Sequence, residues 1–178
     1  AAGSGNILRN GGTFKIDNST SSPTASESLG LLTASTPYSY TSTVVTQAQD
    51  GVNVTQYSVN NQVLQIKVTG TGTCSSALTQ FNLSTTGTAG TDMASNISTA
   101  KIYYTGSSST FATTNLFGSL ATPSGSFTVT GTQALANGDN YFWLTYDVPG
   151  DANTDAVTPL NRLDAQLVSF VLMLGNLL

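Results

Sequence analysis

Gly, Asn, Ser and Thr interrupt this chain every eight to twelve residues, and the short segments between them are rich in Val, Ile, Thr, Tyr and Phe. Short segments of this composition favour β-strands, and their regular spacing is typical of an all-β sandwich. No stretch repeats apolar residues at i, i+3, i+4 and i+7 between capping residues, so helix should be confined to a turn or two, with 92–98 as the best candidate. The chain of 178 residues is long enough for one domain with a single core.

Six segments carry the clearest strand pattern. They are residues 63–69, 77–84, 101–105, 126–130, 140–148 and 165–174. In the fifth segment Phe142, Leu144 and Tyr146 share one face, while Tyr141 and Trp143 lie on the other. A strand that is apolar on both faces is typical of the middle of a sheet that is covered on both sides. We therefore expect this segment to be a central strand.

The last predicted strand is also apolar on both faces. One face would carry Val168, Phe170, Leu172 and Leu174, and the other Leu167, Val171 and Met173. Both faces need cover, which either the chain's own loops or a neighbouring subunit would supply. The apolar run that ends the sequence, 167–178, is shorter than the roughly 20 residues of a membrane-spanning helix, so we expect a buried strand and no transmembrane span.

The N-terminal region differs in composition from the rest of the chain. Residues 18–30 are a low-complexity run of Ser, Thr and small residues with no apolar set to bury. Ahead of this run, Ile7 and Leu8 precede a short segment in which Phe14 and Ile16 alternate with polar residues. An amphipathic strand on a flexible tether can pair within its own domain or with another copy. The expected organisation is an N-terminal extension at 1–17, the candidate donor strand; a Ser/Thr-rich linker and an entry strand, together at 18–43; and a β-sandwich domain at 44–178.

Charged and catalytic side chains are scarce. The sequence has no His, five Lys and Arg, nine Asp and Glu, and 51 Ser and Thr among its 178 residues. Without imidazole there is no Ser-His-Asp or Cys-His nucleophile and no His-ligated metal site. Five cations cannot form the basic surface that binds several phosphates, which argues against nucleic acid as a partner. We therefore expect a protein that is not an enzyme.

The cysteine count and the first residues indicate where such a protein works. Cys74 is the single cysteine, so the chain can form no internal disulfide. The sequence starts with small residues, Ala1-Ala2-Gly3-Ser4-Gly5, as a mature protein does after removal of a signal peptide. We therefore expect an extracellular or cell-surface location.

Two further groups of residues are candidate binding sites. Asp151, Asn153 and Asp155 have the alternate oxygen spacing that opens a calcium loop, but the positions of the EF-hand Gly and Glu hold other residues. A solvated turn is the competing interpretation, so the expectation is no cofactor, with calcium as the alternative. A sugar-stacking platform would use four aromatic side chains, because aromatic faces suit the C–H face of a pyranose, although aromatics at strand spacing more often belong to a core. These four are Tyr103, Tyr104, Tyr141 and Trp143.

From about residue 44 the sequence resembles the N-terminal accessory domain of BNR-repeat neuraminidases. The resemblance rests on VVTQA (44–48), LQIKV (64–68), FNLSTTGT (81–88), AKIYYTG (100–106), STF (109–111), FGS (117–119), PSGSFTVTG (123–131), NYFWLTYDV (140–148), LDA (163–165) and SF (169–170). It implies an antiparallel β-sandwich outside the cytoplasm. Together with the strand spacing, it gives the expected fold class: an all-β, antiparallel β-sandwich, immunoglobulin-like or jelly-roll-like, with an N-terminal extension strand.

The resemblance does not imply sialidase activity. A neuraminidase clamps the substrate carboxylate with three arginines and repeats a Ser-x-Asp-x-Gly-x-Thr-Trp box in its catalytic propeller, whereas this chain has two Arg, one Trp and no such box. The family domain is generally treated as an accessory domain for binding carbohydrate or for spacing and attachment.

The function these observations favour is a secreted structural subunit that forms an extracellular filament or surface layer. Its partners would be copies of itself, joined when the N-terminal strand of one copy adds to a sheet edge of the next, as in donor-strand complementation. The candidate assembly residues are Ile7, Leu8, Phe14, Ile16, Phe170, Leu172 and Leu174. The alternative is a carbohydrate-binding accessory module of a cell-surface or secreted protein, and a third hypothesis is an adhesin or protein-binding stalk unit.

Overall fold

The computed structural model describes residues 36, 38–48, 53–72, 76–85, 91–92, 96–152 and 161–174. The chain divides into two units, Ala1–Thr36 and Pro37–Leu178, and the architecture below belongs to the second. The predicted extension strand and residues 18–35 of the predicted linker lie outside the described residues.

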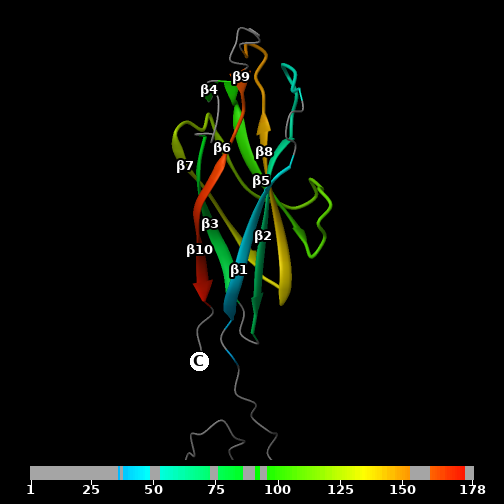
Figure 1. Cartoon of the computed structure of the whole chain (residues 1–178), viewed down its shortest axis with the longest axis vertical. Helices are drawn as coiled ribbons and strands as arrows, with labels where there is room; N and C mark the ends of the chain where they lie inside the picture. Colours follow the sequence, from blue (N-terminus) through cyan, green and yellow to red (C-terminus); the bar gives the residue numbers. More distant parts are fainter. Residues whose placement is uncertain are drawn as a thin grey trace, which may run out of the picture. The chain divides into compact units, whose positions relative to one another are not determined.

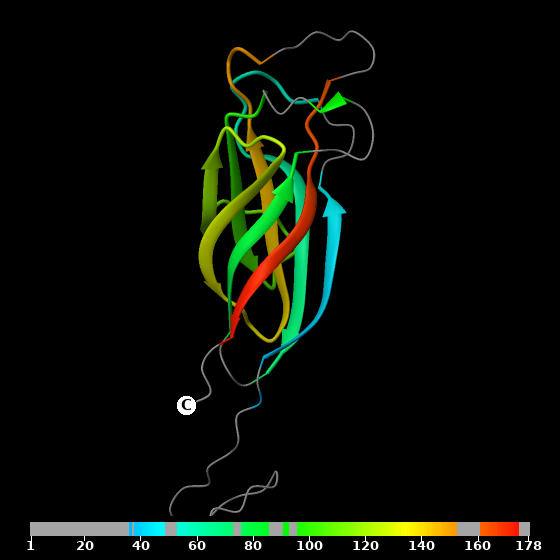
Figure 2. The same cartoon turned by 90° about the vertical axis from the view of Figure 1, so that its left-hand side faces the viewer.

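The strands form two facing antiparallel sheets (Figures 1 and 2). Sheet A holds β1 (Ser39–Gln47), β2 (Asn61–Thr71), β8 (Gly138–Asp147), β5 (Thr99–Gly106) and β6 (Leu116–Ala121), in that spatial order. Sheet B holds β10 (Gln166–Leu174), β3 (Ser76–Ser84) and β7 (Ser126–Ala134), also in spatial order. A two-residue parallel pair, β4 (Thr91–Asp92) and β9 (Asn161–Arg162), completes the set within the described residues. The predicted all-β antiparallel sandwich is confirmed.

The core lies between the sheets and follows the alternation of side chains along each strand. Leu64, Ile66 and Val68 on β2 are at most 2% exposed, whereas the residues between them are half-buried on the outer face. Phe81 on β3 is fully buried and meets Phe142 of β8 edge to face, with ring centroids 5.1 Å apart. The contacts between these rings join the two sheets.

The prediction of a central strand at 140–148 is confirmed. β8 pairs with β2 on one side and with β5 on the other. Its inward residues Phe142, Leu144 and Tyr146 are fully buried, and Trp143 on the outer face is 7% exposed. Cover on both faces explains why the segment lacks the polar alternation of a solvated strand.

The predicted faces of the last strand are wrong for two residues, Leu167 and Val168. The β10–β3 ladder shifts register between Leu167 and Ser169, so Val168 forms a bulge instead of continuing the alternation. As a result Leu167, Phe170 and Leu172 pack against the core, and Val168 is 62% exposed. An extra residue in a strand cannot be recognised from period-2 spacing, which assumes an unbroken ladder.

β6 was not predicted from the sequence, and the predicted entry strand within 18–43 includes only the first part of β1. β1 is exposed along nearly its whole length, and β6 is interrupted by Gly118, so neither shows a strict apolar alternation. In the predicted helical segment 92–98, the described residues contain a helical turn at Asn96 alone. Among the described residues no helix has the length and apolarity to cross a membrane.

The two long sides of the sandwich are built differently. On one side the backbones of β6 and β7 almost touch: a Cβ at Gly118 would lie 2.1 Å from the Thr130 carbonyl oxygen, and a Cβ at Gly131 would lie 2.1 Å from that of Phe117. A residue with a side chain could not occupy either position without moving the strands apart. This side is closed by backbone contact between one edge strand of each sheet, whereas the other side, here called the open side, is bounded by the other two edge strands, β1 and β10.

Near the start of β8, a buried asparagine organises the turn that leads into the strand. Asn140 is fully buried, and its side-chain oxygen accepts hydrogen bonds from the Ala136 N–H and the Tyr104 hydroxyl, each at 2.9 Å. Its amide nitrogen donates to the carbonyl oxygens of Ala136 and Gly138 at 2.8 and 3.2 Å. Because each polar atom of the side chain has a partner, its burial is tolerated.

Candidate functional site

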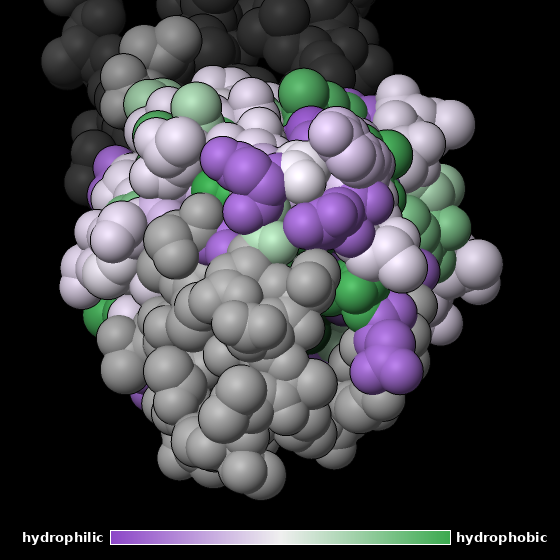
Figure 3. All heavy atoms as spheres, turned by 90° about the horizontal axis from the view of Figure 1, so that it is seen from above, coloured by the Kyte–Doolittle hydropathy of each residue, from purple (hydrophilic) through white to green (hydrophobic). Residues whose placement is uncertain are grey.

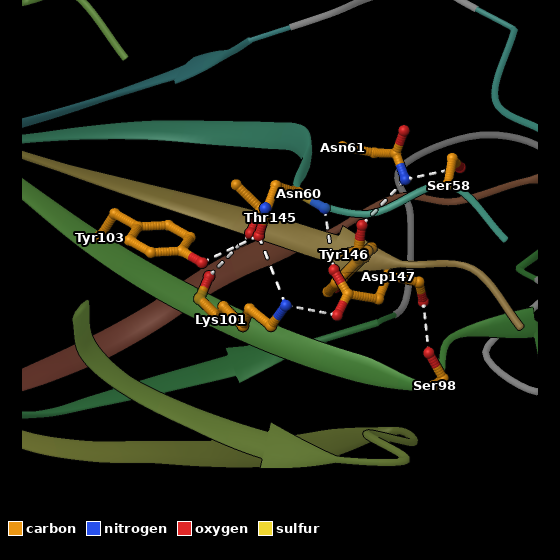
Figure 4. A network of polar contacts seen from close by, with 9 residues as sticks. All are labelled: Ser58, Asn60, Asn61, Ser98, Lys101, Tyr103, Thr145, Tyr146 and Asp147. Carbon is orange, nitrogen blue, oxygen red and sulfur yellow. Dashed lines mark hydrogen bonds and ion pairs between the residues drawn. The ribbon is translucent and has the colours of Figure 1, made fainter. Parts of the chain in front are cut away.

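A polar network lies on the outer face of sheet A, where β5, β8 and the segment before β2 meet (Figure 4). The Lys101 ammonium lies 2.5 Å from the Asp147 carboxylate and 3.4 Å from the Asn60 side-chain oxygen. The Tyr103 hydroxyl donates to the same Asn60 oxygen at 2.9 Å. The Asn60 backbone N–H donates to Asp147 Oδ1 at 2.8 Å. These groups bond to one another across three chain segments that are distant in sequence.

The same network fixes the loop before β2. Asn60 has a φ of 55°, in the left-handed region that asparagine tolerates better than most residues. The Asn61 amide donates to Ser58 Oγ and to the Tyr146 carbonyl oxygen at 2.9 and 3.0 Å, and Val148 donates its N–H to the Ser58 carbonyl oxygen. The arrangement therefore fastens the loop to the end of β8, which is a structural role.

A second ion pair lies on the same face. Lys67 Nζ is 3.4 Å from Asp139 Oδ2, and the Thr69 hydroxyl donates to Asp139 Oδ1 at 2.7 Å. The hydrogen bond from Thr69, followed by the Lys67 charge, lowers the pKa of Asp139 below its usual value. Both partners of this pair are about one-third exposed, so it contributes little to stability.

The structure brings together three of the four predicted sugar-stacking residues. Tyr103 and Trp143 are direct partners in the β5–β8 ladder and share the outer face with Tyr141. Tyr103 and Trp143 are each 7% exposed because Phe111 from the β5–β6 loop packs on both rings, with centroids 5.9 and 5.6 Å away. Phe111 was not among the predicted residues, and its place in a Ser/Thr-rich loop gave no signal of this contact.

Tyr104, the fourth of these residues, faces the core. Its ring lies 4.9 Å from that of Phe142, its hydroxyl bonds to Asn140, and burial raises its pKa. Nearby, Tyr38 packs against Gly70, where a Cβ would lie 2.4 Å from the Tyr38 hydroxyl oxygen. That hydroxyl is buried and has no hydrogen-bond partner within the described part of the chain. Burial, followed by the neighbouring Tyr104, raises the pKa of Tyr38.

Only one of the three predicted calcium ligands is among the described residues. Asp151 is exposed, and Asn153 and Asp155 lie outside the described residues. The described residues contain no group of three or more acidic or thiol side chains placed to hold a metal ion. The calcium site stays a prediction.

The predicted assembly residues fall mostly outside the described part as well. Ile7, Leu8, Phe14 and Ile16 lie there, and so does the side chain of Leu174. Phe170 and Leu172 are described, and both are partly buried against the core. Phe170 meets Tyr40 of β1 edge to face at 5.5 Å, so it forms one contact between the two edge strands.

Beside these residues lies an exposed apolar surface that sequence reasoning did not place correctly. Of the ten exposed large hydrophobic side chains in the described residues, three lie on β1 and three on β10. They are Tyr40, Val44 and Val45 on β1, and Val168, Val171 and Met173 on β10. By contrast, the described atoms visible at the end that carries β4 and β9 are mainly hydrophilic or neutral, with scattered hydrophobic side chains (Figure 3). Exposed apolar side chains therefore concentrate on the two strands that bound the open side of the sandwich, β1 and β10.

The comparison with protein families agrees with this fold and with the position of its strands. Residues 42–167, which are 126 of the 178 in the chain, match the family described as the N-terminal domain of BNR-repeat neuraminidase. The match begins within β1 and ends within β10, so it includes these two strands in part and every strand between them in the sequence. A comparison with curated proteins finds none that matches the chain. The chain belongs to the family of the N-terminal domain of BNR-repeat neuraminidase.

Proposed function

We propose that this chain is a secreted, non-catalytic structural subunit that assembles with copies of itself into an extracellular filament or surface layer. In this proposal the N-terminal extension of one copy adds as a β-strand to a sheet edge of the next. Addition of this kind is head-to-tail and does not close on itself, so it generates fibres.

The observation that carries the proposal is the pair of edge strands on the open side. β1 and β10 are each nine residues long, and neither contains a charged residue or a proline. Natural proteins usually protect long edge strands with such residues, because an unpaired row of N–H and C=O groups recruits other strands. These two strands carry bulges but keep six exposed hydrophobic side chains between them. An edge of this kind is suited to pairing with another chain.

The sequence of the extension matches such an edge. Residues 13–17 alternate polar and apolar side chains, with Phe14 and Ile16 on one face and Lys15 between them on the other. In a neighbouring subunit, the face with Phe14 and Ile16 would pack into the core, while the face with Lys15 would stay in water. The low charge of the whole chain, net −4, also keeps repulsion between packed copies small.

The remaining parts of the proposal rest on composition and family. The chain has no His, and the family that it matches is an N-terminal domain, which supports a role without catalysis. Membership of a neuraminidase-associated family supports an extracellular or cell-surface location. For the alternative of a carbohydrate-binding module, the contacts are less favourable: Tyr103 and Trp143 are 7% exposed beneath Phe111, so their rings offer little area to a sugar.

The test compares full-length chains by light scattering and negative-stain electron microscopy at matched concentration. The test variant is Phe14→Ser with Ile16→Ser, and the control is Thr13→Ser with Lys15→Ser, which changes the opposite face of the same segment. We expect polymers from the native chain and the control, and monomers from the test variant. Monomers from all three, or polymers from all three, would refute the proposal. Glycan binding by monomers would favour the carbohydrate-binding alternative.

A further inference from the structure

The two sheets of the sandwich are unequal. Sheet A has five strands and sheet B has three, and the closed side already brings β6 and β7 together. The shortage of strands in sheet B therefore falls on the other side, where β10 is the last strand of sheet B and β1 the last strand of sheet A (Figures 1 and 2).

The exposure of β1 shows that its inner face lacks cover. Val45 pairs with Ile66 across the β1–β2 ladder, so both side chains point to the same face of sheet A, toward the core. Ile66 is fully buried, whereas Val45 is 43% exposed. Gln47, which pairs with the buried Leu64, is exposed on this same face. A core-facing apolar side chain with this much exposure marks a place where the opposite sheet ends too early.

Near its two ends, β1 contacts β10 and the segment that leads into β10. At one end Tyr40 meets Phe170, and at the other the Gln47 amide donates to Asp164 Oδ1 at 3.4 Å. Val45 lies between these contacts. One further strand beside β10 would lie opposite β1 and cover Val45 from the side of sheet B.

We infer that the free edge of β10 is the acceptor for residues 13–17 of a second copy of this chain, which become the fourth strand of sheet B. This inference rests on the proposed function and names its acceptor. Phe14 and Ile16 would point inward, onto Val45 and beside Phe170, and complete the core. Lys15 would point outward, on the same face as the exposed side chains of β10, so no charge is buried.

The length of the connecting segment favours a second copy over the same chain. Residues 18–38 provide 21 residues between the donor segment and the first residue of β1. Neighbouring strands of one domain are usually joined by a connection of about 2–6 residues. Extended, 21 residues reach up to about 70 Å, and a nine-residue strand is only about 30 Å long. The extended segment is therefore more than twice as long as a strand of the sandwich, which leaves it free to leave its own domain.

The test is disulfide capture in full-length chains with Cys74→Ser as background. Lys15→Cys is combined with Val171→Cys, and in parallel with Val168→Cys or Met173→Cys to cover the register. The matched control combines Lys15→Cys with Val44→Cys, on the outer face of the other edge strand, where exposure is similar at 48% against 43% for Val171. Side chains on the same face of adjacent strands lie about 5 Å apart, close enough for a disulfide.

After oxidation of the polymers, we expect at least one variant with a cysteine on β10 to give a ladder of disulfide-linked dimers, trimers and higher species on a non-reducing gel. The variant with Val44→Cys should form polymers too but should run as a monomer on the same gel, because no disulfide links its subunits. A ladder from the Val44 pair would overturn the inference by placing the donor on β1. Monomers with an internal disulfide would overturn it in favour of pairing within one chain. Polymers visible by microscopy without any ladder would also overturn it but leave the proposed function standing. The absence of polymers from the reduced native chain would refute the proposed function itself.

Discussion

Replacement of the two glycines on the closed side tests whether β6 and β7 are in backbone contact in solution. A Cβ atom essentially never lies closer than 3.0 Å to a heavy atom of another residue. In Gly118→Ala or Gly131→Ala the new Cβ would lie 2.1 Å from a carbonyl oxygen of the opposite strand, so the two strands must move apart by about 0.9 Å. Overpacking of this extent costs about 3 kcal/mol, less a gain of about 0.5 kcal/mol from the stiffer unfolded chain. The net loss of about 2–3 kcal/mol would lower Tm by roughly 4–12 °C for a domain of this size.

Urea unfolding, followed by the fluorescence of the single tryptophan, Trp143, measures this loss. The control is Gly125→Ala, where no atom lies within 4 Å of the added Cβ and the φ of 58° brings a strain of only about 1 kcal/mol. Because one separation of the strands relieves both clashes, the double variant Gly118→Ala/Gly131→Ala should lose less stability than the sum of the single variants, by about 1–3 kcal/mol. Single variants no less stable than the control, or strictly additive losses, would refute the backbone contact.

Three further predictions concern buried polar groups. Asn140→Ala should lower the free energy of unfolding by about 2–4 kcal/mol, measured in urea, because buried donors and acceptors lose their partner. Lys101→Met should cost about 1–3 kcal/mol at pH 7, measured in urea, because it leaves the largely buried Asp147 carboxylate without its cation. Burial raises the pKa of Tyr38 and Tyr104 above the ordinary value of 10.0, so two tyrosines should titrate late in absorbance at 295 nm. Their contribution to stability is complete below pH 10 and is lost as pH rises through the folded-state pKa, so the fall in the urea midpoint should begin near pH 10; normal titration of all seven tyrosines would contradict their burial.

The parts of the fold that were predicted from sequence are those in which one face of a strand is buried. In β2 the alternation of Leu64, Ile66 and Val68 with polar residues reports directly which face meets the core. β8 was recognised for the opposite reason, because both of its faces are covered. In both strands the residues of the strand itself indicate which faces are buried, so each strand could be predicted without knowing which distant residues it contacts.

The parts that were missed depend on contacts between distant residues. Asn60 lies 87 residues from Asp147, and only the folded sheet brings its backbone to that carboxylate. The cover of Trp143 by Phe111 depends on how the β5–β6 loop folds over sheet A. The bulge at Val168 depends on the partner strand β3. Spacing along one segment cannot encode any of these relations.

The weak strand pattern of β1 in the sequence has a physical reason. Its two adjacent valines, Val44 and Val45, point to opposite faces, and both are more than 40% exposed, so β1 has no alternation because neither face is covered. Residues 13–17 have the reverse property, since their alternation calls for one buried face. A strand whose inner face needs cover and a segment with one apolar face to bury therefore occur in the same chain, separated by a linker of 21 residues. In the proposed assembly, residues 13–17 of each subunit cover the inner face of β1 in one neighbour, and its own β1 is covered by residues 13–17 of another. The uncovered edge strand of the larger sheet is then the feature that makes assembly favourable.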